Sequence, residues 1–244
     1  MKRLQHCVIG RIPVLETLRA GKRPVRRLYL LRGAKDLDAL RAAAGSLPIE
    51  ECTREELDGL AGETAHQGAV LDAAPLMIWA LADWLRNPPP ADAIVVVLDG
   101  IEDPHNFGAI VRTAAACGAA AVVFGKDRAA PLSAVASKAA AGGMEHVALI
   151  QVTNITRALE GLKEAGFWTA ALAEDAEQVL WQADLKGRIA LVLGNEGYGI
   201  RRLVREHCDF LLRIPLPGVI STLNVSVSAA VALAECIRQR AAAR

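Results

Sequence analysis

From residue 93 onward, short apolar runs alternate with longer helical segments, and this alternation restricts the folds that the chain can adopt. Residues 93–99, AIVVVLD, have no polar residue before the last position. A strand without polar alternation is typical of a parallel sheet that is covered on both faces. Because parallel strands need crossover connections, the segments between them are expected to be helices. We therefore expect an α/β fold with a parallel sheet in this part of the chain.

The remaining segments of this region repeat the same pattern. We expect further strands at residues 119–124, 146–150, 167–173, 188–194 and 210–216. We expect helices at residues 107–117, 133–143, 153–166, 199–208 and 224–240. Gly118 directly follows the first of these helices and suits the left-handed backbone at a helix end.

Residues 1–75 carry a shorter alternation, which predicts a small α/β domain. We expect its strands at 26–31, 48–52 and 68–73, and its helices at 10–21, 35–45 and 53–62. Thr53 precedes the last of these helices and Glu56 follows three residues later, which is the pattern of a capping box.

Three consecutive prolines at residues 88–90 separate the two regions. Such a triplet cannot continue a helix or lie in a central strand, and it favours a stiff, extended chain. We therefore place a Pro-rich linker at residues 76–92, between an N-terminal domain of residues 1–75 and a C-terminal domain of residues 93–244.

The charge of the chain is unevenly distributed although its net value is only +1. Residues 1–32 hold nine Lys or Arg and one acidic residue, whereas residues 33–75 hold three basic and nine acidic residues. A basic segment in a small domain suits a polyanion such as RNA. On charge alone, an ordinary solvated surface explains the pattern equally simply.

Several classes of protein are disfavoured by what the sequence lacks. No apolar run is long enough to span a bilayer, and the first residues, MKRLQHCVIGR, do not form a signal peptide. Five cysteines are scattered, without a CxxC pair, at positions 7, 52, 117, 208 and 236. They are expected to be reduced thiols rather than disulfides or zinc ligands. We expect a cytoplasmic protein with no membrane partner and no metal.

Ligands of open α/β sheets bind at the carboxyl ends of the strands, and three loops there are rich in polar residues and glycine. The loops are residues 100–108, GIEDPHNFG, residues 194–199, GNEGYG, and residues 217–224, PGVISTLN. The glycine order G-x-G-x-x-G is absent, as are the P-loop and the G-x-S-x-G elbow. A dinucleotide-dependent dehydrogenase, a nucleoside triphosphatase and a hydrolase of the elbow type are therefore disfavoured.

Together with their flanks, these loops resemble the three motifs of a known family. Residues 103–118, 191–200 and 214–235 are similar to the motifs of the SpoU/TrmH family of ribose 2′-O-methyltransferases, in the SPOUT superfamily. The resemblance continues into residues 1–75, which look like the substrate-binding domain of the family members that modify guanosine in large-subunit (23S) ribosomal RNA. It implies S-adenosylmethionine as cofactor, RNA as partner, a homodimer, and a deep trefoil knot in the C-terminal domain.

Arg112 is the residue for which the resemblance implies the most direct role in the reaction. The expected helix around it is apolar except for Arg112 and Thr113, so the guanidinium must reach solvent, pair with a carboxylate or serve a ligand. The family role is activation of the 2′-hydroxyl. Because a guanidinium stays charged, we expect it to stabilise negative charge on the oxygen, while an RNA phosphate or solvent takes part in proton removal. The methyl group of a sulfonium is already activated, so the reaction needs no metal.

The resemblance also implies roles for residues in the three loops. Four further residues are expected near the methyl acceptor, although turn and capping roles also suit them: Asn106, Glu196, Ser221 and Asn224. Residues expected to hold the cofactor, through backbone groups and apolar contact, are Gly194, Asn195, Ile214, Leu216 and Leu223. In the N-terminal domain, residues expected to contact RNA are Arg11, Arg26, Arg27, Arg32, His66 and Gln67.

Three other functions remain open from the sequence. The chain could modify a guanosine of transfer RNA, or it could be a non-catalytic RNA-binding or ribosome-assembly protein that keeps the fold. A small-molecule α/β enzyme is the third alternative. The presence of all five polar residues, Asn106, Arg112, Glu196, Ser221 and Asn224, favours an active enzyme.

Overall fold

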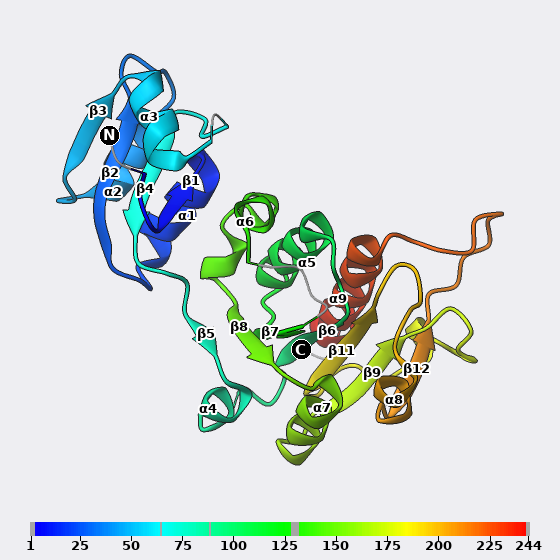
Figure 1. The fold of residues 1–244 in the computed structure, drawn as a ribbon. Coiled ribbons are helices and arrows are strands. Elements are labelled where there is room, and N and C mark those ends of the chain that lie inside the picture. The colour runs from blue at the N-terminus through cyan, green and yellow to red at the C-terminus, as the bar shows by residue number, and fades with distance from the viewer. Residues whose placement is uncertain (1–2, 64, 88, 128–131, 243–244) are drawn as a thin grey trace.

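The computed structural model describes residues 3–63, 65–87, 89–127 and 132–242, which form two β-sheets with helices packed on them (Figure 1). Residues 1–2 and 243–244, at the ends of the expected domains, and Pro88 of the expected linker lie outside this range. The smaller sheet has the strand order β1-β4-β2-β3. Its strands are β1 (Cys7–Ile9), β2 (Val25–Leu31), β3 (Ile49–Cys52) and β4 (Ala69–Ala73).

Helices cover both faces of the four-stranded sheet. They are α1 (Arg11–Ala20), α2 (Asp38–Ala44) and α3 (Arg54–Ala61). Successive side chains of β2 point to opposite faces, so Leu28 and Leu30 pack with α1 and α2, whereas Tyr29 packs with α3. The capping box expected at the start of α3 is confirmed, because Thr53 and Glu56 exchange side-chain and backbone hydrogen bonds.

The larger sheet contains eight parallel strands in the order β10-β12-β9-β11-β6-β7-β8-β5, as expected for an α/β domain. Its strands are β5 (Ile78–Trp79), β6 (Ile94–Asp99), β7 (Ala121–Gly125), β8 (Ala148–Val152), β9 (Trp168–Leu172), β10 (Gln178–Val179), β11 (Ile189–Gly194) and β12 (Phe210–Arg213). Every residue of β6 is buried, which confirms the prediction from its unbroken apolar run.

Helices lie on both faces of this sheet, so it has three layers (Figure 1). One face carries α5 (Pro104–Ala116), α6 (Ala134–Ala140) and α9 (Val225–Ala241). The other carries α4 (Leu81–Leu85), α7 (Ile155–Glu164) and α8 (Arg202–Glu206). Two single turns of 3₁₀ helix complete the described elements, η1 (Gly143–Glu145) and η2 (Leu180–Gln182). Val96 and Leu98 of β6 pack under α5, and Val95 and Val97 pack under α7.

The stretch of residues 76–92 differs from the extended linker expected from its prolines. It contains β5, which pairs with β8 at the edge of the larger sheet, and the short helix α4. The side chains of Trp79, Leu81 and Trp84 pack against the core beneath α7, so this stretch is part of the C-terminal α/β layer structure. The apolar residues that precede the prolines explain the difference, because they gain more by burial than by remaining extended in water.

The N-terminal domain, built on the smaller sheet, contacts the C-terminal domain where α1 packs against η1. The carboxylate of Glu145 is buried, and it pairs with Arg23 at 2.6 Å and lies 3.0 Å from the hydroxyl of Thr17. Around this pair, His146 contacts Glu16 at 2.9 Å. A buried carboxylate thus joins segments that are more than one hundred residues apart in the sequence.

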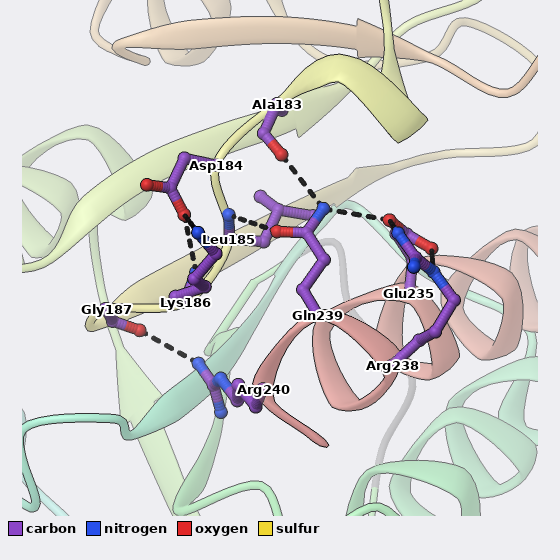
Figure 2. A network of polar contacts seen from close by, with 9 residues as sticks. All are labelled: Ala183, Asp184, Leu185, Lys186, Gly187, Glu235, Arg238, Gln239 and Arg240. Atoms are coloured by element: carbon purple, nitrogen blue, oxygen red, sulfur yellow. Dashed lines mark hydrogen bonds and ion pairs between the residues drawn. The ribbon is translucent and has the colours of Figure 1, made fainter. Parts of the chain in front are cut away.

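The C-terminal helix is attached to the turn before β11 by a buried amide (Figure 2). The side-chain carbonyl of Gln239 accepts a hydrogen bond from the amide of Leu185 at 2.9 Å. Its Nε2 donates to the carbonyl of Ala183 at 2.9 Å and to Glu235 at 2.8 Å. Glu235 is also bonded by Arg238 through both carboxylate oxygens, which lowers the pKa of that carboxyl group.

Replacing Gln239 with alanine is expected to destabilise the protein by about 2–3 kcal/mol, because it leaves buried backbone groups of Ala183 and Leu185 without partners. The matched control is Lys186→Ala in the same turn, which removes only an exposed ion pair with Asp184 at 3.9 Å and should cost less than about 1 kcal/mol. Urea unfolding followed by circular dichroism measures both changes. Equal stability of the two variants would contradict the anchoring role of Gln239.

Candidate functional site

Four neighbouring parallel strands end at the same edge of the larger sheet. Asp99 at the end of β6 lies opposite Gly194 at the end of β11, and Leu172 of β9 lies opposite Leu212 of β12. The loops that follow these strands therefore emerge side by side. They include the three loops in which the sequence analysis places the reaction and cofactor residues.

The first loop is shorter than expected because α5 begins at Pro104 rather than at residue 107. The side chain of Asp103 caps the helix by accepting a hydrogen bond from the amide of His105 at 2.9 Å. Proline at the first helical position needs no amide partner and presets the helical backbone angle. Asn106 thus lies in the first turn of the helix and is not its N-cap, so its side chain is free for other contacts.

Asn106 links the other two loops through its side-chain amide. Its Nδ2 donates to the carboxylate of Glu196, and its Oδ1 accepts a hydrogen bond from Nδ2 of Asn224 at 3.0 Å. Asn224 in turn caps α9, because its Oδ1 accepts from the amide of Ser226 at 2.9 Å. These contacts join three of the expected catalytic residues into one chain, which fixes their orientations. Phe107, fully buried against the ring of Phe124, holds this turn of α5 on the sheet.

The glycine loop after β11 folds back on itself. Asn195 and Gly199 exchange two backbone hydrogen bonds, and the side chain of Asn195 donates to the carbonyl of Gly100 at 2.7 Å. A Cβ atom on Gly194 would lie 2.3 Å from the carbonyl carbon of Gly199. The loop itself therefore requires glycine at residue 194, in addition to any approach of a cofactor.

The same loop is anchored by a buried charge that the sequence analysis missed. Asp99 is fully buried and accepts hydrogen bonds from the amide of Arg201 at 2.8 Å and from its Nε at 2.7 Å. These hydrogen bonds raise the pKa of the Arg201 guanidinium. The signal was present in the sequence, since a carboxylate that ends an otherwise apolar strand must find a partner.

Substituting Gly194 with alanine is expected to displace the glycine loop and to destabilise the protein by about 1–3 kcal/mol through overpacking. Gly197→Ala is the matched control in the same loop, because its Cβ would meet nothing closer than Asn195 Oδ1 at 3.3 Å. Thermal unfolding of the two variants tests this difference. If alanine at residue 197 proved as harmful as alanine at residue 194, the close approach to Gly199 would not be the cause.

Arg112 lies on α5 but outside the polar chain of Asn106. It is six residues further along the helix, about 9 Å at the usual rise per residue. Its side chain is exposed and has no hydrogen-bond or ion-pair partner within the part of the chain that the structure describes. A Cβ on Gly143 would lie 2.9 Å from the Cα of Arg112, so η1 packs directly on this turn. The guanidinium is therefore free to meet a ligand from outside.

The loop between β12 and α9 carries the remaining expected residues, and it extends away from the body of the domain (Figure 1). Ile214 and Leu216 are half-buried, and Ile214 packs against the core. Ser221 is exposed without a hydrogen bond among the described residues, and Leu223 is 36% exposed. The structure thus brings Ile214 to the strand edge but leaves the tip of the loop in solvent.

The six residues expected to contact RNA fall into two groups. On β2, Arg26 pairs with Asp72 and Arg27 with Glu50, while Arg32, directly after β2, reaches the backbone carbonyl of Glu51 in β3. Acidic partners therefore neutralise two of the arginines on this strand. The second group gathers around a cavity in the N-terminal domain, of about 510 Å³, and comprises Arg11, His66 and Gln67.

His66 has both ring nitrogens engaged inside the domain. Its Nδ1 accepts a hydrogen bond from the amide of Gly68 at 2.9 Å, and its Nε2 lies 3.0 Å from the carboxylate of Asp58. The ring is only 3% exposed, so it shapes the loop and has no free nitrogen for RNA. Arg54 also lines the cavity, and the sequence analysis missed it because it lies in an acidic segment.

Neither metal nor membrane features are found in the described regions. No three described His, Cys, Asp or Glu residues lie together as metal ligands would. No described helix has the length and apolar character needed to cross a bilayer.

Each of the two regions of the chain matches a known protein family. The SpoU rRNA Methylase family matches residues 93–234, and the RNA 2′-O ribose methyltransferase substrate binding family matches residues 7–79. A Pseudomonas aeruginosa protein named 23S rRNA (guanosine-2′-O-)-methyltransferase RlmB is 42% identical over 240 residues, which cover 96% of each chain. The protein of the same name from Xanthomonas campestris is 38% identical over 246 residues, covering 98% of this chain and 99% of its own.

Solved structures share the fold. The SpoU methyltransferase AviRb from Streptomyces viridochromogenes, in complex with the cofactor AdoMet, superposes with a TM-score of 0.77 at 24% identity. The match covers 98% of this chain and 91% of AviRb. With two family matches along most of its length, the chain belongs to the SpoU rRNA Methylase family.

Proposed function

We propose that this protein is an S-adenosylmethionine-dependent methyltransferase that modifies the ribose 2′-hydroxyl of a guanosine in 23S ribosomal RNA. The observation that carries the proposal is the similarity to relatives named for this reaction, at 42% identity over 96% of both chains. The chain of hydrogen bonds from Glu196 through Asn106 to Asn224 supports it, because it joins residues from all three family motifs.

The loop after β12 offers suitable groups for the cofactor. Within the described chain, the backbone C=O groups of residues 215–222 and the N–H groups of the residues there other than Pro215 and Pro217 form no hydrogen bonds, so they are available to the polar edges of an adenosine. The half-buried side chains of Ile214 and Leu216, with Leu223, provide apolar surface for its rings. Gly194 and Asn195 lie at the end of β11, which is separated from β12 by β9 alone, at the same edge of the sheet. When bound, S-adenosylmethionine supplies an activated methyl group on its sulfonium sulfur.

The reaction requires the ribose oxygen to lie in line with the methyl carbon and the sulfur. With S-adenosylmethionine bound, the 2′-oxygen would accept the methyl group from the sulfonium sulfur, which would leave as a thioether, and the hydroxyl would lose its proton to an RNA phosphate or to solvent. The carboxylate of Glu196 orients Asn106, and we assign Asn106, Ser221 and Asn224 to positioning the ribose. Arg112 stabilises the negative charge that develops on the oxygen, since its guanidinium donates up to five hydrogen bonds and has no internal partner.

The assay that tests this function combines the full-length protein, S-adenosylmethionine with a labelled methyl group, and a 23S rRNA transcript. One guanosine of the transcript should acquire a 2′-O-methyl group, located by mass spectrometry of nuclease fragments, while a transfer RNA pool stays unmodified. Methylation of transfer RNA alone would replace the ribosomal substrate. If calorimetry detected no binding of S-adenosylmethionine at millimolar concentration, a non-catalytic RNA-binding role would replace the enzyme.

A homodimer is part of the proposal. One side of α9 presents apolar residues at helical spacing, of which Val227 is 47% and Ile237 is 41% exposed. Val231 and Ala234 continue the same stripe. An exposed apolar stripe on a helix that also borders the site suits contact with a second copy. Sedimentation velocity should give twice the monomer mass, and a monomer at micromolar concentration would refute this assembly.

The proposed knot and cellular location follow from the same family assignment. Strand β11 lies between β9 and β6, and the chain returns from β12, which lies between β10 and β9, to pack α9 on α5, an arrangement compatible with a chain threaded through a loop. Tracing residues 189–240 in an experimental structure checks the knot. We place the protein in the cytoplasm, where its proposed ribosomal RNA substrate would be found in bacteria such as those of the relatives.

The proposed division of labour assigns RNA selection to residues 1–75 and catalysis to residues 93–244. Each region has its own hydrophobic core, so deletion of residues 1–75 is expected to leave a folded protein that binds S-adenosylmethionine. Its preference for 23S rRNA over unrelated RNA should fall at least about tenfold, because the phosphate and loop contacts of the N-terminal domain are lost. Filter binding with both RNAs measures the ratio, and an unchanged ratio would contradict this division.

A further inference from the structure

One cavity of the N-terminal domain has the lining of a small anionic ligand site. It holds about 510 Å³ and opens where α1 and α3 begin, beside the loop before β4. Arg11, Arg54 and Gln67 supply polar groups, and Ile12 and Leu31 supply apolar walls. A volume of this size lies within the range of small-molecule sites in proteins.

The two arginines of this cavity differ from Arg26 and Arg27 because neither forms an ion pair with an acidic side chain among the described residues. The side chain of Arg54 forms no hydrogen bond, and its charge acts only at longer range on the neighbouring Glu55. Arg11 uses only Nε, which donates to the carbonyl of Gln67 at 2.9 Å, so the two terminal nitrogens of its guanidinium remain free. Two unpaired guanidinium groups at one cavity favour a phosphate, which can accept several hydrogen bonds from them.

Gln67 is held in an unusual conformation at the same place. Its backbone φ of 54° lies in the left-handed region, which residues other than glycine seldom adopt. Two contacts from Arg11 maintain it, the Nε bond to its carbonyl and a bond from the amide of Arg11 to its Oε1 at 3.2 Å. The Nε2 of Gln67 has no partner among the described residues and can donate to a base. Strained residues that neighbouring contacts hold in place are typical of binding sites.

The position of the cavity connects it to the catalytic region. A Cβ on Gly142 would lie 3.7 Å from the carbonyl oxygen of Ile12, and the adjacent Gly143 packs on the backbone of Arg112. The cavity therefore lies near the junction from which α5 presents Arg112 to solvent.

We propose that this cavity binds a single unstacked nucleotide of the substrate RNA, at a site separate from the methylated ribose. Arg11 and Arg54 bind its phosphate, Gln67 donates to its base, and the base lies against Ile12 and Leu31. The inference rests on the proposed function for the identity of the RNA. It adds an anchor that fixes a second point of the RNA relative to Arg112. Unstacked bases in loops and bulges are what proteins read in structured RNA.

The test compares three variants of the full-length protein in binding to the 23S rRNA transcript. Arg54→Ala should weaken binding at least about tenfold and reduce the salt dependence of binding by about one phosphate contact. Gln67→Gly keeps the left-handed backbone but removes the amide, and it should weaken binding without lowering thermal stability. The control is Arg41→Ala in the same domain, whose side chain is 39% exposed and paired with Glu51, and it should bind within about twofold of the wild type.

The outcomes separate the anchor from the enzymatic function. Wild-type affinity in both cavity variants, or an equal loss in Arg41→Ala, would overturn the anchor. Affinity for guanosine monophosphate equal to that for the transcript would overturn the assignment to RNA. If the wild type bound RNA in an Arg54-dependent way but transferred no methyl group, the anchor would stand and the proposed function would fail.

Discussion

Replacing Arg112 with alanine is expected to lower the rate of methyl transfer at least about 100-fold while leaving the fold and the affinity for S-adenosylmethionine unchanged. The side chain is exposed and forms no hydrogen bond or ion pair with the described residues, so its loss removes no polar interaction that holds the fold. What is lost is a fixed positive charge for the developing oxyanion. Single-turnover kinetics with saturating 23S rRNA and cofactor measures the effect on the chemical step.

Two further variants separate charge from general surface effects. Arg112→Lys keeps the charge without the planar fork and should retain an intermediate rate. Arg157→Ala is the matched control, because Arg157 is an exposed helical arginine of α7, on the opposite face of the sheet. A wild-type single-turnover rate in Arg112→Ala would show that the guanidinium takes no part in catalysis.

The helices and strands that could be predicted from the sequence are those in which burial of the whole element produces a continuous or periodic pattern of apolar residues. The apolar run of residues 93–99 predicts β6 because a strand with no polar face has to be covered on both sides. The short strands β1 and β10 were not predicted, since two or three residues carry no periodicity. The prolines at 88–90 predicted an extended linker over residues 76–92. In the structure, β5 and α4 precede the prolines: β5 pairs with β8 of the larger sheet, and α4 packs on one face of it.

The candidate site was predictable to the level of its loops. Parallel strands predict that the segments after β6, β11 and β12 meet, and the hydrogen bonds of Asn106 to Glu196 and Asn224 join all three of these segments. The partners of individual side chains were not predictable, because they depend on packing between distant segments. Arg201 reaches Asp99 across about one hundred residues, and helix α5 begins three residues earlier than its apolar pattern suggests.

The contacts between the two domains are the clearest example of side-chain partners that the sequence does not predict. Nothing near Glu145 in the sequence indicates a partner, and Thr17 lies 128 residues away. The buried carboxylate pairs with Arg23, whose side chain is only 13% exposed and also donates to the carbonyl of Ala74 at 2.8 Å. Because η1 packs on both α1 and the turn of Arg112, this pair sets the position of the N-terminal domain relative to α5.

Replacing Glu145 with alanine is therefore expected to open the domain junction rather than to unfold the protein. Breaking a buried ion pair by removing one partner costs about 3–5 kcal/mol, because Arg23 would be left buried without a countercharge. Separation of the domains restores water to Arg23, and each domain retains its own core, so opening is the less costly response.

Limited proteolysis at residues 74–77, which join β4 of the N-terminal domain to β5 of the larger sheet, should become at least about tenfold faster in Glu145→Ala, while the circular dichroism spectrum stays unchanged. Methyl transfer to 23S rRNA should fall, because an RNA held by the N-terminal domain would no longer be fixed relative to Arg112. Lys138→Ala is the matched control at the same junction, since its pair with Glu63 is exposed and contributes less than about 1 kcal/mol. Equal cleavage rates for wild type and Glu145→Ala would mean that the domains are held together by other contacts, and the coupling of the junction to catalysis would then have no basis.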